Sequence, residues 1–174
     1  MLTSNYKNII NGTANSTGSS LSIDCSIKNT DGNSFTGVYS GSMTGSNNFG
    51  KFFAEQILLK NSDELMASTS MSPDKAYSAQ AVMFDSDISD TDYALKTAVG
   101  TTSISNIGGK IGITVANSSG SDITINGILL CMTILVKPAY SYKTILVAEW
   151  KFDDLVIPNG DSKTWTVDHN FELG

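Results

Sequence analysis

Arginine is missing from the chain: all eleven basic residues among its 174 are lysines. Arginine is the side chain that proteins use most for bidentate recognition of phosphate and carboxylate groups. The formal net charge is −6, so the chain also lacks the positive surface that attracts nucleic acid. We therefore expect no nucleic-acid partner.

Cysteine and histidine are scarce, with Cys25, Cys131 and His169 as their only representatives. Three such residues are too few for a four-ligand structural zinc site. Cys131 lies in an apolar run, where a thiol behaves as a small hydrophobic group, so we expect two free thiols and no disulfide. His169 has no assignable serine or cysteine partner, and no phosphate-loop or dinucleotide motif is present. These gaps predict neither an enzyme nor a cofactor.

Long apolar runs are also lacking. The longest, residues 128–136, contains Thr133 and is about half a membrane-spanning helix in length. The first residues do not combine a basic start with an apolar stretch, as a signal peptide would. The sequence therefore predicts a chain made in the cytoplasm, with no membrane partner.

Alternation of apolar and polar residues is the main positive signal, and it fills the last third of the chain. Residues 111–115, 123–125 and 165–173 alternate, with His169 on the apolar face of the last stretch, and residues 128–136 and 144–152 are almost continuously apolar. A period of two with β-branched and aromatic residues indicates strands with a buried face. The predicted core consists of Ile113, Val115, Ile123, Ile125, Leu130, Leu146, Trp165, Val167 and Phe171.

Turn residues separate these stretches and shorter strands precede them. Residues 117–122 and 158–161 are rich in Asn, Ser, Gly and Asp, which favour tight turns. Earlier strands are predicted at 21–28, 34–39, 81–84 and 101–107, with a hairpin turn at Asp31-Gly32, a connection at 73–80, and 51–61 open between strand and helix. The sequence thus predicts an all-β antiparallel sandwich, jelly-roll or immunoglobulin-like, with little helix and a single domain over residues 21–174.

Residues 1–20 are predicted to form an N-terminal arm. Within it, residues 5–10 are either a short helix or a docked segment, and Tyr6, Ile9 and Ile10 form a small apolar group ahead of a polar run. An apolar group on a flexible tether gains most by docking into a neighbouring copy. We therefore expect a homo-oligomer with Tyr6, Ile9 and Ile10 at its interface.

Two further groups of residues are candidate sites. Asp85, Asp87, Asp90 and Asp92 supply oxygen ligands suited to Ca²⁺, although a solvated loop with turn-capping carboxylates is the favoured interpretation and no metal is expected. Exposed aromatic residues would form a platform that stacks on sugars; the candidates are Tyr39, Tyr140, Tyr142 and Trp150. Trp165 is expected in the core instead.

Several segments together resemble a group of small structural proteins of tailed bacteriophages, of the type found in gut phages. The opening MLTSNYK resembles their start, and FDSDISDTDYAL at 84–95 resembles their strand, acidic loop and Asp-Tyr-x-Leu element. ITVANSSGSDITIN at 113–126 resembles their T-V-x-N-x-S-G-x-D-I-T-I hairpin. Residues 145–149 and 156–167 resemble their ending, which contains a Pro-Asn-Gly turn; Glu149 stands where a basic residue is common in the group. Residues 84–173 are the best-matched half.

The resemblance implies a β-sandwich that serves as a non-enzymatic part of a virion, at the capsid surface, head fibre, collar or tail. Its partners would be further copies of itself and other virion proteins, after synthesis in the bacterial host cytoplasm without a signal peptide. The alternative is a carbohydrate-binding or adhesive module that uses the aromatic platform on host-surface glycans.

Overall fold

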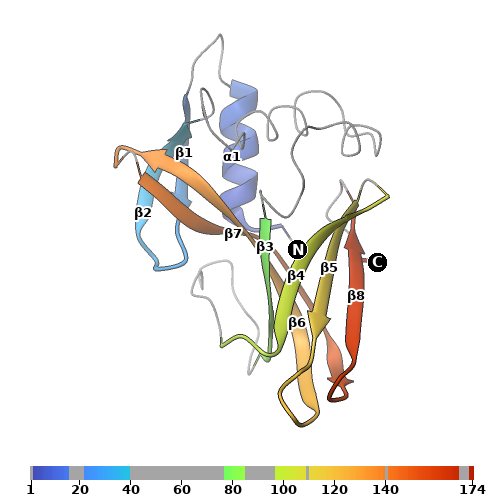
Figure 1. The fold of residues 1–174 in the computed structure, drawn as a ribbon. Coiled ribbons are helices and arrows are strands. Elements are labelled where there is room, and N and C mark those ends of the chain that lie inside the picture. Colours follow the sequence, from blue (N-terminus) through green and yellow to red (C-terminus); the bar gives the residue numbers. More distant parts are fainter. Residues whose placement is uncertain are drawn as a thin grey trace.

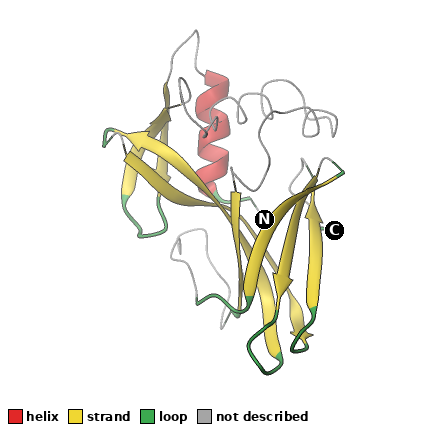
Figure 2. Ribbon diagram, in the orientation of Figure 1, coloured by secondary structure: helices red, strands yellow, loops and turns green. Residues whose placement is uncertain are grey.

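The computed structural model describes residues 2–15, 22–39, 77–84, 97–108, 110–139, 141–168 and 173–174 (Figure 1). Its elements in chain order are α1 (Ser4–Asn15), β1 (Ser22–Lys28), β2 (Ser34–Tyr39), β3 (Tyr77–Val82), β4 (Thr101–Ile107), β5 (Lys110–Ala116), β6 (Ile123–Lys137), β7 (Ser141–Ile157) and β8 (Ser162–Val167). All pairings between these strands are antiparallel. The predicted all-β, sandwich-like fold with little helix is confirmed (Figure 2).

The strands form two sheets built around β6 and β7. Sheet A has the order β1-β2-β6-β3, with β7 on the other edge of β6, and sheet B has the order β4-β5-β8. β6 and β7 are 15 and 17 residues long and pair from Ile123↔Ile157 to Val136↔Ser141. Figure 1 shows sheet B beside the lower ends of these two strands and α1 next to β1 at the other end. The long ladder therefore links the two halves of the fold.

The main core is continuous from the helix to sheet B. It contains Tyr6 and Ile9 from α1, the inward residues of β5 and β8, and alternate residues of β6 from Ile128 to Val136. Of the predicted core, seven residues are buried: Ile113, Val115, Ile125, Leu130, Leu146, Trp165 and Val167. Ile123 is only partly buried, and Phe171 lies outside the described residues.

The face that β6 and β7 turn toward this core changes along the ladder. The pairing has two irregularities, between Ile125 and Gly127 and between Leu130 and Cys131. At the first irregularity, Ile125 and Ile128 both face the main core although they are three residues apart. At the second, the adjacent residues Val147 and Ala148 both face it. Each extra residue in a strand exchanges its inward and outward positions. A single alternation therefore does not describe these strands.

A second, smaller core lies on the opposite face of sheet A. It consists of Val82, Phe84, Leu129, Cys131 and Leu146. The Phe84 ring lies directly against Gly127, where an added Cβ would overlap the ring. Asn126 reinforces this junction, because its side-chain oxygen accepts the Phe84 N–H at 2.6 Å. β6 is consequently buried on both faces, which explains its nearly unbroken apolar run.

Two sequence predictions about strand limits are wrong. Residues 165–173 do not form one strand: β8 ends at Val167, and Leu173 pairs back with Val167 in the antiparallel direction. Thr166 and Gly174 exchange backbone hydrogen bonds of 3.1 and 2.8 Å, so the chain end covers the outer edge of β8. Residues 77–80, expected as a connection, belong to β3 and pair with β6. Residues 77–80 pair with the buried strand β6, and the sequence of these four residues alone does not reveal that pairing.

The prediction that the N-terminal arm docks into a neighbouring copy is wrong for residues 2–15, which dock on their own domain. The short helix, one of the two alternatives for residues 5–10, is present as α1. Leu2 forms a bridge with Ala148, and the Thr3 N–H donates to the Val147 carbonyl at 3.0 Å. Tyr6 and Ile9 are 6% and 0% exposed, so they are not available to a neighbour. The sequence does not reveal this docking, because the carbonyls that accept from the Thr3 hydroxyl lie 143 and 144 residues away along the chain. The Ile10 side chain and residues 16–20 lie outside the described residues.

Thr3 and Asn5 hold the helix on the irregular part of β7. The Thr3 carbonyl accepts the Lys7 N–H at 3.1 Å, which makes Thr3 the N-cap, and its hydroxyl donates to the Leu146 carbonyl at 2.7 Å. Asn5 is 1% exposed, donates to the Lys28 carbonyl and accepts from the Lys28 N–H, both at 2.8 Å. These two side chains therefore join β7 to the end of β1.

Replacing Asn5 with alanine is expected to lower the free energy of unfolding by about 2–3 kcal/mol, because buried backbone groups lose their partners. Asn8→Ala is the matched control on the same helix: its bond to the Ser26 carbonyl, 2.7 Å long, is exposed. Asn8→Ala should lower the free energy of unfolding by less than about 1 kcal/mol. Urea denaturation measures both, and equal losses would contradict the role given to Asn5.

Trp165→Ala is expected to cost about 3–5 kcal/mol, as for other buried large aromatic residues. Trp165 is 9% exposed and its ring stacks on Phe152 at a centroid distance of 5.8 Å, joining the two sheets. Trp150→Ala should cost less, because Trp150 is only partly buried at the margin of the main core. A loss below about 1 kcal/mol for Trp165→Ala would show that this packing contributes little.

Candidate functional site

Two connections between the sheets meet at one end of the sandwich, and we name residues 117–122 and 158–161 the paired-turn tip. Asn117 is at its centre and is 2% exposed. Its backbone N–H donates to the Asp161 carbonyl at 2.9 Å, and its carbonyl accepts the Gly160 N–H at 2.8 Å. Its side-chain amide donates to the carbonyls of Ile157 and Ser121, both at 2.8 Å. Asn117 thus binds both turns at once.

The second asparagine of the tip completes the connection. The Asn159 side-chain oxygen accepts the Gly120 N–H at 2.9 Å, and the Asn159 N–H donates to an Asp122 carboxylate oxygen at 3.1 Å. Gly120 and Gly160 have φ angles of +92° and +88°, which glycine adopts without the steric cost of a Cβ. The turn chemistry was predicted from sequence, whereas the mutual bonding of the turns was not, because it depends on their spatial proximity.

An open groove lies on the β1–β2 hairpin. It has a volume of about 460 Å³ and is lined by Cys25, Ser26, Ser34, Phe35 and Thr36. It lies where the β1–β2 register shifts, between Asp24 and Ile27. A volume of this size suits a small ligand.

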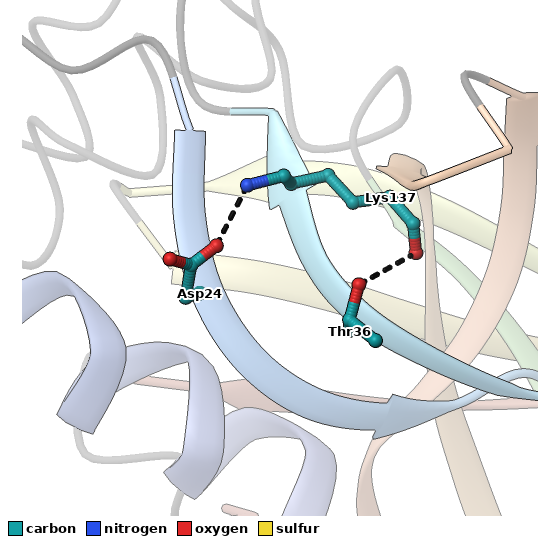
Figure 3. Close-up of polar contacts among 3 residues, drawn as sticks. All are labelled: Asp24, Thr36 and Lys137. Carbon is teal, nitrogen blue, oxygen red and sulfur yellow. Dashed lines mark hydrogen bonds and ion pairs between the residues drawn. The ribbon is translucent and has the colours of Figure 1, made fainter.

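Polar contacts join Asp24, Thr36 and Lys137 where the β1–β2 hairpin meets the end of β6 (Figure 3). Lys137 Nζ at the end of β6 lies 2.6 Å from the Asp24 carboxylate on β1, and the Thr36 hydroxyl donates to the Lys137 carbonyl at 3.5 Å. The Asp24 side chain is 86% exposed, so the pair stabilises the fold by only about 0–1 kcal/mol. Since β2 and β6 pair at only two positions, Gly37↔Lys137 and Val38↔Val136, these contacts help to position the hairpin.

The groove contains hydroxyl groups, an aromatic ring and a thiol of low reactivity. Burial, followed by the neighbouring Asp24 carboxylate, raises the pKa of Cys25 to about 11, although Lys137 opposes the shift. The thiol is therefore protonated at neutral pH and is a poor nucleophile. This chemistry suits contact with a neutral polar ligand such as a sugar.

Two residues of the predicted aromatic platform, Tyr142 and Trp150, do not lie together. Tyr142 is 51% exposed, but it lies on the face of β7 that carries Leu146, whereas Trp150 packs against the main core on the other face. The two residues are also about 26 Å apart along the strand. The extra residue at Val147 places Tyr142 and Trp150 on opposite faces of β7. The sequence pattern does not reveal this change of face. The Tyr39 side chain and Tyr140 lie outside the described residues.

Of the remaining predicted site residues, some are described by the structure and others lie outside the described residues. Cys25 and Cys131 are free thiols, as expected, and burial raises the pKa of Cys131 to about 12. Asp85, Asp87, Asp90, Asp92 and His169 lie outside the described residues. Within the part that the structure describes, no three His, Cys, Asp or Glu side chains are grouped as metal ligands. Among those same residues, no helix has the length and apolar character to cross a membrane.

Comparisons of the chain with protein-family models, with curated proteins and with solved structures find no match. The function is therefore argued from the residues and the geometry.

Alkaline pH is expected to destabilise the fold. Burial raises the pKa of Tyr6, Tyr77 and Cys131 above the ordinary values of 10.0 for the phenols and 9.0 for the thiol. The unfolded chain releases these protons at the ordinary values, whereas the folded chain retains them. The stabilisation is thus complete below pH 9 and falls as the pH rises through 9 to 12.

Urea unfolding at a series of pH values measures this dependence. Tyr77→Phe should flatten the curve above pH 10, because the variant has no phenol proton to release at that position. An unchanged slope would show that Tyr77 does not contribute to the alkaline loss.

Proposed function

We propose that the chain is a non-enzymatic structural component of a tailed-phage virion that acts through oligomeric assembly. The observation that carries the proposal is the paired-turn tip. The segments 113–126 and 156–167, which carry much of the resemblance to phage structural proteins, are far apart in sequence but contact each other there through Asn117 and Asn159. The resembling residues therefore act together in one structural unit.

The construction of the tip also suits an assembly role. Asn159 and Asp122 each accept a backbone N–H of the opposite turn, and Asn117 donates to the Ile157 carbonyl, which fixes the ends of four strands relative to one another. A surface of fixed shape loses little conformational entropy when it meets a partner. The proposed partners are further copies of the chain and other virion proteins, and the proposed location is the particle, after synthesis in the bacterial host cytoplasm.

A second candidate function is recognition of a glycan at the β1–β2 groove. Phe35, which is half-buried against the main core, would offer its exposed part to a sugar ring, and Ser26, Ser34 and Thr36, which also line the groove, would supply hydroxyl groups. This site replaces the aromatic platform expected from the sequence. It would give an adhesive role to the same β-sandwich.

The test is mass spectrometry of purified particles of the phage that encodes the chain, with its copy number per particle. We expect many copies, in a fixed ratio to the capsid or tail subunits, together with an oligomeric mass of the purified chain by light scattering. Its absence from particles would contradict the virion role. A strict monomer that binds on a glycan array, and loses that binding in Phe35→Ala but not in Tyr142→Ala, would favour the second function.

A further inference from the structure

The chain contains Asn-Gly pairs at residues 11–12, 126–127 and 159–160. Asparagine is chemically labile, and in such a pair the glycine backbone nitrogen can attack the asparagine side chain, because no Cβ hinders its approach. We propose that Asn159-Gly160 is a site of this spontaneous modification and that the hydrogen bonds of the paired-turn tip control its rate. The inference goes beyond the proposed function, since it does not depend on what the tip binds.

The reaction is a cyclisation followed by hydrolysis. The Gly160 nitrogen forms a bond to Asn159 Cγ and gives up its proton, while the bond between Cγ and Nδ2 breaks, so that the amide group leaves as ammonia with that proton. The product is a five-membered succinimide ring. Water then adds to one of its two carbonyl carbons and opens the ring to an aspartate or to an isoaspartate, in which the backbone runs through the side chain.

The structure places the three pairs in different surroundings. The pair at 126–127 lies in β6, where Asn126 is 8% exposed and its side-chain amide binds the backbone N–H and carbonyl of Phe84. The pair at 11–12 lies inside α1, so cyclisation there requires the helix to unwind. The pair at 159–160 lies in an exposed turn. It is therefore the pair that the smallest local opening makes reactive.

Both reacting groups of this pair are bonded while the tip is closed. The Gly160 N–H donates to the Asn117 carbonyl at 2.8 Å, and the Asn159 side-chain oxygen accepts the Gly120 N–H at 2.9 Å. The Gly160 nitrogen must lose its proton and approach Cγ, so its bond to Asn117 has to break first. The bond from Gly120 holds the Asn159 side chain toward the opposite turn. The closed tip thus protects the pair.

Asn117 determines how often the tip opens. Local openings of a native protein cost less free energy than global unfolding, and a reaction that requires an opening proceeds in proportion to the open population. The Asn117 side chain is 2% exposed and donates to the carbonyls of Ile157 and Ser121. These buried bonds hold the two turns together, so their loss increases the open population.

The two products have different effects on the tip. An aspartate at position 159 retains a side-chain oxygen that can accept the Gly120 N–H. An isoaspartate adds a methylene carbon to the backbone of the turn, which displaces the Gly160 N–H from the Asn117 carbonyl. The tip then cannot close as before. A chain with isoaspartate at this position loses the fixed shape of the tip irreversibly.

Peptide mapping of the full-length chain by mass spectrometry tests the proposal, after incubation in mildly alkaline buffer with and without concentrated urea. We expect residue 159 to convert about tenfold or more slowly in the folded chain than in urea, because the blocking hydrogen bonds are then intact. Asn117→Ala should raise the rate in the folded chain about tenfold, since both of its side-chain bonds to the turns are lost.

A milder variant and a control on another turn accompany this change. Asp122→Ala removes the acceptor of the Asn159 N–H, which lies 3.1 Å away at the surface of the tip, and should raise the rate as well. Asn29→Ala is the control, because Asn29 is 1% exposed and accepts the Asn33 N–H at 2.8 Å in the β1–β2 turn. It destabilises the fold outside the tip and should leave the rate at residue 159 unchanged.

Unfolding midpoints verify that each variant is folded, and Asp122→Ala decides where Asn117→Ala does not fold. Equal rates in buffer and in urea would overturn the protection, and no conversion in urea would overturn the modification site itself. Rates unchanged by both tip variants, or raised equally by Asn29→Ala, would overturn control by the tip. The number of copies per particle tests the proposed function separately, so failure of one inference is distinguishable from failure of the other.

Discussion

Hydrogen bonding along the β6–β7 ladder is the constraint on which the other elements depend. β2 and β3 both pair with the edge of β6 that faces away from β7. The start of β6 and the end of β7 connect to sheet B through the paired-turn tip. Irregularities in this ladder allow two strands to cover two cores, but they leave backbone carbonyls without ladder partners. Thr3 satisfies those near Val147, and Asn126 binds the backbone of Phe84 at the other irregularity. Thr3 thus satisfies ladder carbonyls at one interruption, whereas Asn126 uses the other to join β6 to the backbone that follows β3.

The sequence predicted the regular part of this arrangement because regular alternation is a local property. The inward residues of β5, Ile111, Ile113 and Val115, were readable from β5 alone, as were the turn residues of the tip. The exchange of faces at Val147 was not, since an extra residue in an apolar run leaves the run apolar. The position of α1 was hidden for a related reason: Thr3 is recognisable as a helix cap, but its second partner, the Leu146 carbonyl, is defined only by the fold.

The candidate surfaces also combine features that the sequence reveals with features that only the fold defines. Aromatic and acidic residues attract attention in a sequence, but Tyr142 and Trp150 belong to different faces, and no chemical signal singled out Ser26 or Ser34 beside the β1–β2 groove. The outward residues of β4, β5 and β8 are mostly the polar residues between the apolar ones of predicted strands. In the sequence they look like ordinary solvent-facing residues. Only the registers of β4, β5 and β8 place Ser103, Thr114 and Thr164 in one row.

The two ends of the molecule therefore differ in what remains for a partner. At the helix end, Asn5 and Tyr6 occupy the backbone and the apolar surface of sheet A, so the N-terminal segment stabilises its own domain. At the other end, sheet B buries one face against sheet A, and the bonds of Asn117 and Asn159 fix the ends of its strands. The paired-turn tip is therefore the part of this end whose shape is set by its own hydrogen bonds before any partner arrives.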